Sequence, residues 1–168
     1  MQGGQDLAAR NIQRARDHGV PGYAAYRSLC SKTDVSRFSH LSDVMSPASL
    51  SALARTYSRV EDVDLWVGGL LETPLPGALV GPTFSCLLAE QFARTRRGDR
   101  FFYSQPNSAG LSPGQLAAVT SCSLARLLCD NSNIAFLQPL AFRLAADWNP
   151  LVHCDSEAIP ALDLTPWA

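Results

Sequence analysis

The chain has 168 residues, of which 46% are hydrophobic and 17% are charged, and its formal net charge is −1. This length and apolar content suffice for a folded domain with a core, and they exclude a disordered chain. A net charge so close to zero, with both signs mixed along the sequence, argues against nucleic acid or an anionic membrane as a partner. The sequence has no run of about 18 apolar residues, so no membrane-spanning helix is expected.

The stretch Asp6–Tyr23, with the sequence DLAARNIQRARDHGVPGY, predicts a helix together with its start and stop signals. Asp6 is an acidic residue of the kind that favours a helix start. Gly19, Pro21 and Gly22 predict its end, because glycine suits a helix C-cap and proline cannot donate a backbone hydrogen bond to the preceding turn.

One face of this helix would carry Leu7, Asn11 and Arg14, whose spacing is i, i+4, i+7. A buried amide or guanidinium is costly unless a partner satisfies it, so these residues are unusual on a core-facing helix. For Arg14, an outside partner with planar oxygens, a carboxylate or a phosphate, suits the guanidinium fork. The alternative is a solvent-facing side chain or an internal salt bridge to Asp6 or Asp17. The spacing alone leaves both interpretations open.

Three further helices are expected. Ser46–Pro47 and Ser112–Pro113 each place serine at an N-cap and proline at the first helical position, and the second of these helices should continue toward Cys129. Another begins at Gly81–Pro82 and should end at Gly98, a left-handed cap after a basic last turn. Each of these helices, and a short segment before Cys30, should have an apolar face. The expected residues are Tyr23, Tyr26 and Leu29 before Cys30; Leu50, Leu53, Ala54 and Tyr57 after Pro47; Phe84, Leu87, Leu88 and Phe92 after Pro82; and Leu116, Val119, Leu124 and Leu127 after Pro113. The proline-containing tail after Asn131 should be mostly irregular and held by Cys154, Trp148 and Trp167.

Three carboxylates, Glu61, Asp62 and Asp64, lie close together before Trp66. Such a group could serve acid–base chemistry or bind a hard cation. No glycine-punctuated ligand loop accompanies them, so we interpret them as helix-start acids that interact with the positive end of the helix dipole.

The five cysteines lack the close pairs and histidine spacings of structural zinc sites. In a chain of this size they predict two disulfides and one remaining thiol, which indicates an oxidising compartment. The first residues, MQGGQDLAAR, have neither a basic nor an apolar region of a signal peptide. The two observations agree if the chain is the downstream part of a longer secreted protein, with Met1 an internal or assigned start.

Residues 11–23, NIQRARDHGVPGY, resemble the N-x-Q-R-x-R-D-H-G-x-P-G-Y signature of the animal haem peroxidases. The resemblance covers essentially the whole chain and continues through VDLWVGG (63–69), VGPTFSCLL (80–88), RGDRFFY (97–103), SLARLLCDNS (123–132) and LDLTPW (162–167). It implies that residues 1–168 are the carboxy-terminal, proximal-side part of a catalytic domain that is mainly α, with long irregular loops and two disulfides. The NPLVHCDS segment and Tyr103 resemble the arthropod-type members more than the mammalian ones.

The resemblance assigns roles to the residues on this face of the first helix. Asn11 matches the asparagine that accepts a hydrogen bond from Nδ1 of the proximal haem-ligating histidine, and so supports catalysis through a histidine absent from this chain. Arg14 matches the arginine that pairs with a haem propionate, and Leu7 would by its position wall the proximal side. Arg10 departs from the usual apolar residue before the asparagine, which puts the packing of that face in doubt. The motif histidine His18 is not the haem ligand in the family.

The histidines His40 and His153 match nothing in the family and are expected at the surface or in packing. The resemblance also implies the cysteine pairing, Cys30 with Cys86 and Cys129 with Cys154, and leaves Cys122 as the free thiol. In the family, the distal histidine and arginine, the carboxylates that esterify the haem, the calcium loop and the proximal histidine all lie upstream of the asparagine motif. No metal ligand is therefore expected in this chain; haem, b-type or ester-linked, and calcium would belong to the complete protein.

The implied function is that of part of a secreted haem peroxidase that uses hydrogen peroxide to oxidise a halide or a phenol. Its partners would be hydrogen peroxide, a small reducing substrate and the upstream part of the domain, and the chain alone should be inactive. The alternative is a non-catalytic secreted helical adhesion or binding module that uses the integrin-type triplet Arg97-Gly98-Asp99, and a third possibility is a truncated gene. A part of a larger core should also expose an apolar surface.

Overall fold

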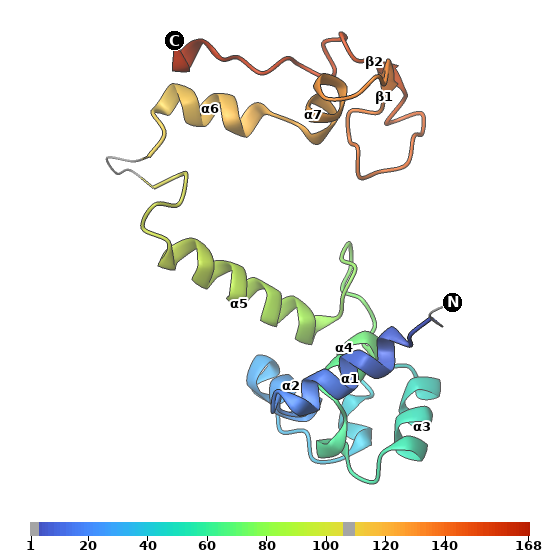
Figure 1. The fold of residues 1–168 in the computed structure, drawn as a ribbon. Coiled ribbons are helices and arrows are strands. Elements are labelled where there is room, and N and C mark those ends of the chain that lie inside the picture. The colour runs from blue at the N-terminus through green and yellow to red at the C-terminus, as the bar shows by residue number, and fades with distance from the viewer. Residues whose placement is uncertain (1–3, 106–109) are drawn as a thin grey trace. The chain divides into compact units, whose positions relative to one another are not determined.

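The computed structural model describes residues 4–105 and 110–168. The chain divides into two compact units, residues 1–96 and residues 97–168. We call them the first and the second unit and describe each by itself; Figure 1 shows their elements in chain order.

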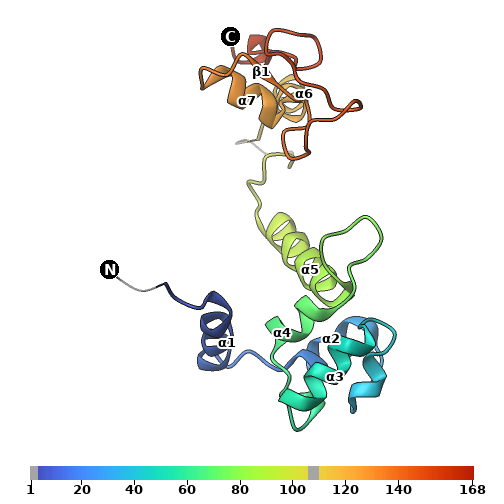
Figure 2. The same ribbon diagram turned by 90° about the vertical axis from the view of Figure 1, so that its right-hand side faces the viewer.

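The first unit is mainly helical, with an irregular link over residues 73–81. Its elements are α1 (Leu7–Asp17), α2 (Tyr23–Ser31), a 3₁₀ turn (Phe38–Leu41), α3 (Pro47–Thr56), a second 3₁₀ turn (Val60–Asp62), α4 (Leu65–Leu71) and α5 (Pro82–Gly98), which ends just past the unit boundary. Helix α2 packs against α4 and α3 packs against the first 3₁₀ turn, while α1 stands at the edge of the unit and also contacts α4 (Figure 2). The expected mainly α architecture is confirmed.

Both predicted ends of α1 are formed by local hydrogen bonds. The Asp6 side chain accepts from the Ala9 amide at 3.1 Å. At the other end Gly19 adopts a positive φ of 66°, so its amide donates to the Arg16 carbonyl and the Val20 amide to the Ala15 carbonyl. This double closure satisfies the last carbonyls of the helix and turns the chain away.

The core of the first unit lies between α2, α3 and α4 and consists of Tyr23, Ala24, Val35, Leu41, Met45, Leu53, Val60 and Val63. The aromatic ring of Tyr23 lies directly against α4, where a Cβ on Gly68 would come within 2.2 Å of the ring. The expectation for Leu29 is wrong, because its side chain is 71% exposed. Helix α2 instead turns Tyr23, Ala24 and Arg27 inward, and Arg27 forms an ion pair with Asp43 at 2.8 Å.

Two helix boundaries differ from expectation. Gly98 is the last residue of α5 and is not a left-handed cap. The chain turns after it because the Asp99 side chain and carbonyl accept from the amides of Phe101 and Phe102, which makes a glycine cap unnecessary. The helix expected from Ser112 toward Cys129 is two helices, since Ser123 starts a new one by accepting from the Arg126 amide at 3.0 Å.

The second unit contains α6 (Pro113–Ser121), α7 (Leu124–Asp130), the antiparallel strands β1 (Phe136–Leu137) and β2 (Val152–His153), and a 3₁₀ turn (Thr165–Trp167). Its core gathers Ala125, Cys129, Cys154 and Ile159. The tail is pinned by Cys154, as expected, but Trp148 and Trp167 are 66% and 43% exposed and do not anchor it. Buried Asn149 does so instead, because its side chain bonds the backbone of residues 140, 143 and 144.

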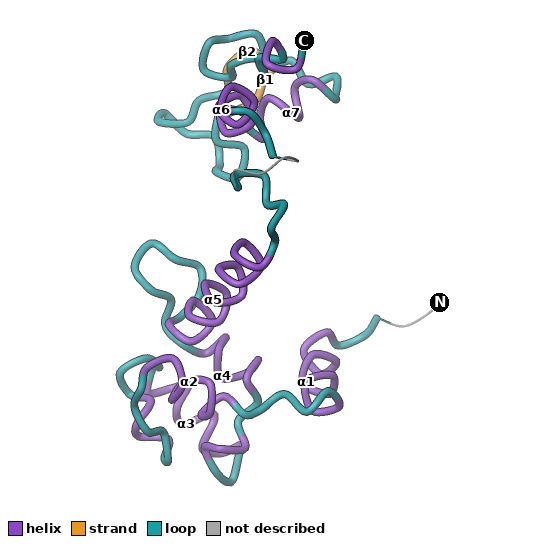
Figure 3. The backbone as a smooth tube through the Cα atoms, turned by 90° about the vertical axis from the view of Figure 1, so that its left-hand side faces the viewer, coloured by secondary structure: helices purple, strands orange, loops and turns teal. Residues whose placement is uncertain are grey.

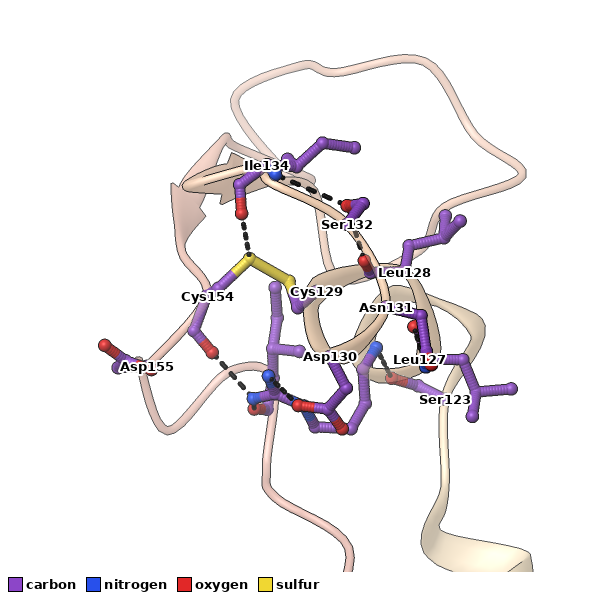
Figure 4. A network of polar contacts seen from close by, with 12 residues as sticks. Ser123, Leu127, Leu128, Cys129, Asp130, Asn131, Ser132, Ile134, Cys154 and Asp155 are labelled. Atoms are coloured by element: carbon purple, nitrogen blue, oxygen red, sulfur yellow. Dashed lines mark hydrogen bonds and ion pairs between the residues drawn. A yellow bond between two sulfur atoms is a disulfide. The ribbon is translucent and has the colours of Figure 1, made fainter.

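Two disulfides join Cys30 to Cys86 in the first unit and Cys129 to Cys154 in the second, which is the pairing that the resemblance implies. Figure 4 shows the second bridge beside Asp130, whose carboxylate accepts from Arg126 at 2.6 Å. Arg126 also donates to the Cys154 carbonyl at 2.8 Å, so the bridge and this arginine together tie the tail to α7. Cys122 is a half-buried free thiol.

Large apolar side chains are exposed on both units, as expected for a part of a larger core. The most exposed are Leu79 at 97%, Phe142 at 91% and Leu144 at 89%. Across the described ranges, no helix combines the length and the apolar character needed to cross a bilayer.

Candidate functional site

The three side chains of α1 that the sequence singles out differ in exposure. Leu7 is 69% exposed, Arg14 is exposed and Asn11 is half-buried. Within the described part of the chain, neither the Asn11 amide nor the Arg14 guanidinium has a hydrogen-bond or ion-pair partner. The internal salt bridges to Asp6 and Asp17 are not formed. Figure 3 shows α1 at the edge of the unit with α4 beside it.

A shallow hollow of about 470 Å³ runs along α1 and is bordered by Ala9, Arg10, Gln13, Arg14, Asp17 and His18. Arg14 therefore borders open space, and so does the Arg10 guanidinium. Arg10 does not pack into the unit; it is exposed and donates to Gln5. The departure at Arg10 is thus accommodated at the surface, where it leaves the packed side of α1 unaffected.

On the opposite side of α1, Arg16 reaches Asp64 with two bonds. Its Nε donates to Oδ1 at 2.9 Å and its Nη2 to Oδ2 at 2.7 Å, and the Tyr57 hydroxyl also donates to Oδ2 at 2.7 Å. Hydrogen bonding from Arg16 lowers the pKa of the Asp64 carboxyl, although burial opposes the shift. Burial, together with the hydrogen bond to Asp64, raises the pKa of Tyr57, so this phenol stays protonated and donating.

Asp64 does stand at the start of a helix, as interpreted, but its side chain does not interact with the end of that helix. The side chain does not cap α4 because its oxygens are taken by Arg16 and Tyr57. Glu61 lies at the surface and pairs with Arg59 at 3.4 Å. No group of three or more potential metal ligands exists among the described residues.

A second buried polar cluster was not predicted. Glu72 accepts from the Tyr23 hydroxyl at 2.7 Å, from the Thr83 amide at 2.8 Å and from the Thr83 hydroxyl at 2.6 Å. All three residues are at most 4% exposed. Burial, and then the hydrogen bond to Glu72, raises the pKa of Tyr23 well above its usual range. The sequence gives one signal for this cluster, because Tyr23 is the last residue of the NIQRARDHGVPGY motif. The apolar periodicity does not mark Glu72 as buried.

The remaining candidates lie at the surface. His18 is 4.0 Å from Asp17, His40 is exposed, and His153 accepts from the Asp155 amide at 3.2 Å. In the adhesion-type triplet, Arg97 and Gly98 belong to α5, and Asp99 is exposed. The triplet thus has a helical start and is not carried on a projecting loop.

Comparison with known proteins connects this geometry to a family. The family model for animal haem peroxidase matches residues 1–142. A "Peroxidase" of Drosophila melanogaster is 46% identical over 169 residues, which cover 99% of this chain and 24% of the relative. "Peroxidase-like protein 3" of Lottia gigantea is 39% identical over 163 residues, which cover 96% of this chain and 53% of the relative.

Among solved structures, Peroxidase A from Dictyostelium discoideum superposes with a TM-score of 0.54 at 45% identity, covering 62% of this chain and 20% of that one. The chain thus spans about a quarter to a half of the curated relatives named above. The matched residues include the whole of α1 with its motif. The chain belongs to the animal haem peroxidase family.

Proposed function

We propose that this chain is the carboxy-terminal, proximal-side part of the catalytic domain of a secreted haem peroxidase, and that both units belong to that one domain. The observation that carries the proposal is the exposed Arg14 guanidinium on the motif helix, which lacks a partner among the described residues. An arginine with this freedom is suited to bind a carboxylate that the rest of the chain does not supply. Two disulfides support an oxidising, extracellular compartment.

The side of α1 that exposes Leu7 and Arg14 suits a haem edge. Arg14 offers a planar fork for a propionate, and exposed Leu7 offers an apolar surface on the same side of the helix. The Asn11 amide oxygen is available to accept Nδ1–H of a proximal histidine contributed by the upstream part of the domain. The haem could be b-type or ester-linked, and calcium would bind upstream.

When bound, the haem would supply the reduction of hydrogen peroxide and the oxidation of a halide or a phenol. The chain's own residues have supporting roles. Arg14 would neutralise the propionate charge and orient the macrocycle, and Asn11 would hold the histidine ring in one orientation and raise its basicity. Neither residue moves a proton to or from peroxide, so the chain alone should have no turnover.

Binding is tested by titrating ferric haemin into the 168-residue chain and following the Soret band. Arg14→Ala should weaken haemin binding about tenfold or more, the loss of one charge-assisted fork interaction. Arg37→Ala is the matched control, because Arg37 is another exposed arginine of the first unit. Equal affinities of the two variants, or no Soret change with the unmodified chain, would contradict the role of Arg14.

Activity is tested separately, with guaiacol or a halide as the reducing substrate. The chain with haemin should oxidise either substrate no faster than free haemin. Turnover above that level would show that the catalytic groups are not all upstream.

The adhesion alternative receives less support from the geometry, because Arg97 and Gly98 are helical. Integrin-dependent cell attachment that disappears in Asp99→Ala would nevertheless establish it.

A further inference from the structure

Helix α1 is held to the first unit by little apolar burial. None of its residues is fully buried, and the side chains facing the unit, Ala8, Ile12 and Ala15, are half-buried. Hydrophobic stabilisation scales with the apolar area removed from water, so this contact fixes the helix only weakly. The rotation of α1 about its axis must therefore depend on a directional interaction.

The Arg16–Asp64 pair is such an interaction. Arg16 and Arg14 are two positions apart and so point in directions about 160° apart around the helix. Two parallel bonds, at 2.9 and 2.7 Å, join the Arg16 fork to the carboxylate. Asp64 is only 8% exposed and is held a third time by the Tyr57 hydroxyl, so it forms a fixed point in the unit.

We propose that Arg16 is a positioning residue for the haem-binding face of α1: by gripping Asp64 on one side, it sets the direction in which Arg14 and Asn11 point on the other. This inference rests on the proposed function, and it extends it to a residue that does not itself face the haem. A bidentate fork resists rotation, whereas a lysine ammonium makes a single point contact. Compared with Arg16→Ala, Arg16→Lys keeps the positive charge and should keep only part of the positioning effect.

The first test needs no haem. Hydrogen exchange of the backbone amides should accelerate about tenfold in α1 of Arg16→Ala, while α2, α3 and α4 keep their protection. The exchange rate of α1 in Arg16→Lys should lie between those of Arg16→Ala and the unmodified chain. The rate in Arg37→Ala should equal that of the unmodified chain. Unchanged exchange in α1 of Arg16→Ala would refute the proposal, because the pair would then not fix the helix.

The second test is a double-mutant cycle on haemin affinity, measured by the Soret band. Arg16→Ala alone should weaken binding about tenfold, and it should add almost nothing to Arg14→Ala, because Arg16 acts through Arg14. A merely structural role would give losses that multiply, and that result would overturn the proposal. Monitoring helix content by circular dichroism excludes variants that fail to fold.

The two proposals fail differently. If Arg14→Ala leaves haemin affinity unchanged, the proposed haem site is wrong, and the positioning role falls with it. If Arg14→Ala weakens binding and Arg16→Ala does not, the haem site stands and only the positioning role is refuted.

Discussion

The hydroxyl of Tyr23 donates a 2.7 Å hydrogen bond to the Glu72 carboxylate, and this pair joins the end of the peroxidase motif to the residue after α4. Thr83, in the first turn of α5, completes the cluster with two more donors to the same carboxylate. A buried carboxylate is tolerated because three donors satisfy it. The motif thus ends in the core of the unit and not on the exposed side of α1 that is proposed to bind haem.

Tyr23→Phe should lower the free energy of unfolding by about 1–3 kcal/mol, since it leaves a buried acceptor oxygen of Glu72 with one donor fewer. Urea denaturation measures the change. Tyr26→Phe is the control, because Tyr26 is half-buried and its hydroxyl has no partner in the described part of the chain. Equal stabilities of the two variants would show that the Glu72 cluster contributes nothing to folding.

The pair Arg16–Asp64 predicts a pH dependence. Because the folded state holds the pKa of Asp64 below its usual value, the pair contributes stability above about pH 4, the usual range of an aspartate. That contribution is lost as the pH falls through the lower, folded-state pKa. Asp64→Asn should therefore be less stable than the unmodified chain at pH 7, and the difference should shrink below pH 4.

Urea denaturation at a series of pH values measures this difference. Asp34→Asn serves as the control, because Asp34 is exposed and has no partner among the residues that the structure describes. A difference for Asp64→Asn that stays constant down to strongly acidic pH would contradict the assignment.

The Cys30–Cys86 disulfide closes a long loop, with a sequence separation of 56. Replacing both cysteines by serine should cost about 2–4 kcal/mol, because the unfolded chain gains the conformations that the bridge forbids. Thermal unfolding under non-reducing conditions measures the loss. Cys122→Ser changes the free thiol and should shift the unfolding temperature little; a similar fall in both would mean that the bridge is not the cause.

Asn149 organises the loop before it, with its side chain accepting from the Leu140 amide and donating to three carbonyls. Asn149→Ala should destabilise the second unit by about 1–3 kcal/mol, since buried backbone groups lose their partner. Hydrogen exchange at the Leu140 amide should accelerate. Asn131→Ala, which removes an exposed bond to Leu127, should leave that amide protected, and the opposite order of effects would count against the role of Asn149.

Local chemistry explains why part of the fold could be predicted. The ends of α1 depend on Asp6 and Gly19, which act on backbone groups within four residues, and the serine starts of α3 and α6 work in the same way. The prediction of a single helix from Ser112 toward Cys129 was wrong. The apolar spacing from Leu116 to Leu127 continues through Ser123, and only the new cap at Ser123 shows that two helices are present.

The sequence predicted the side of α1 that carries Arg14, but not the contact that Arg16 makes on the other side. The helical spacing placed Leu7, Asn11 and Arg14 on one face, and the family resemblance indicated a haem edge as their proposed partner. The sequence could not indicate that Arg16 would grip Asp64, 48 positions away, because pairing at that distance depends on how α1 and α4 pack.

By itself, the sequence determined the family, the mainly α character and the helix that carries the motif, because these follow from short-range patterns and a long shared signature. Tertiary structure alone decided which polar groups are satisfied. Asp64 and Glu72 are both acids near helix ends in the sequence, yet Asp64 accepts from Arg16 of α1 and Glu72 accepts from buried Tyr23 in the core. Their burial depends on contacts between segments far apart in the chain, and a carboxylate is stable there only where such contacts bring donors to it.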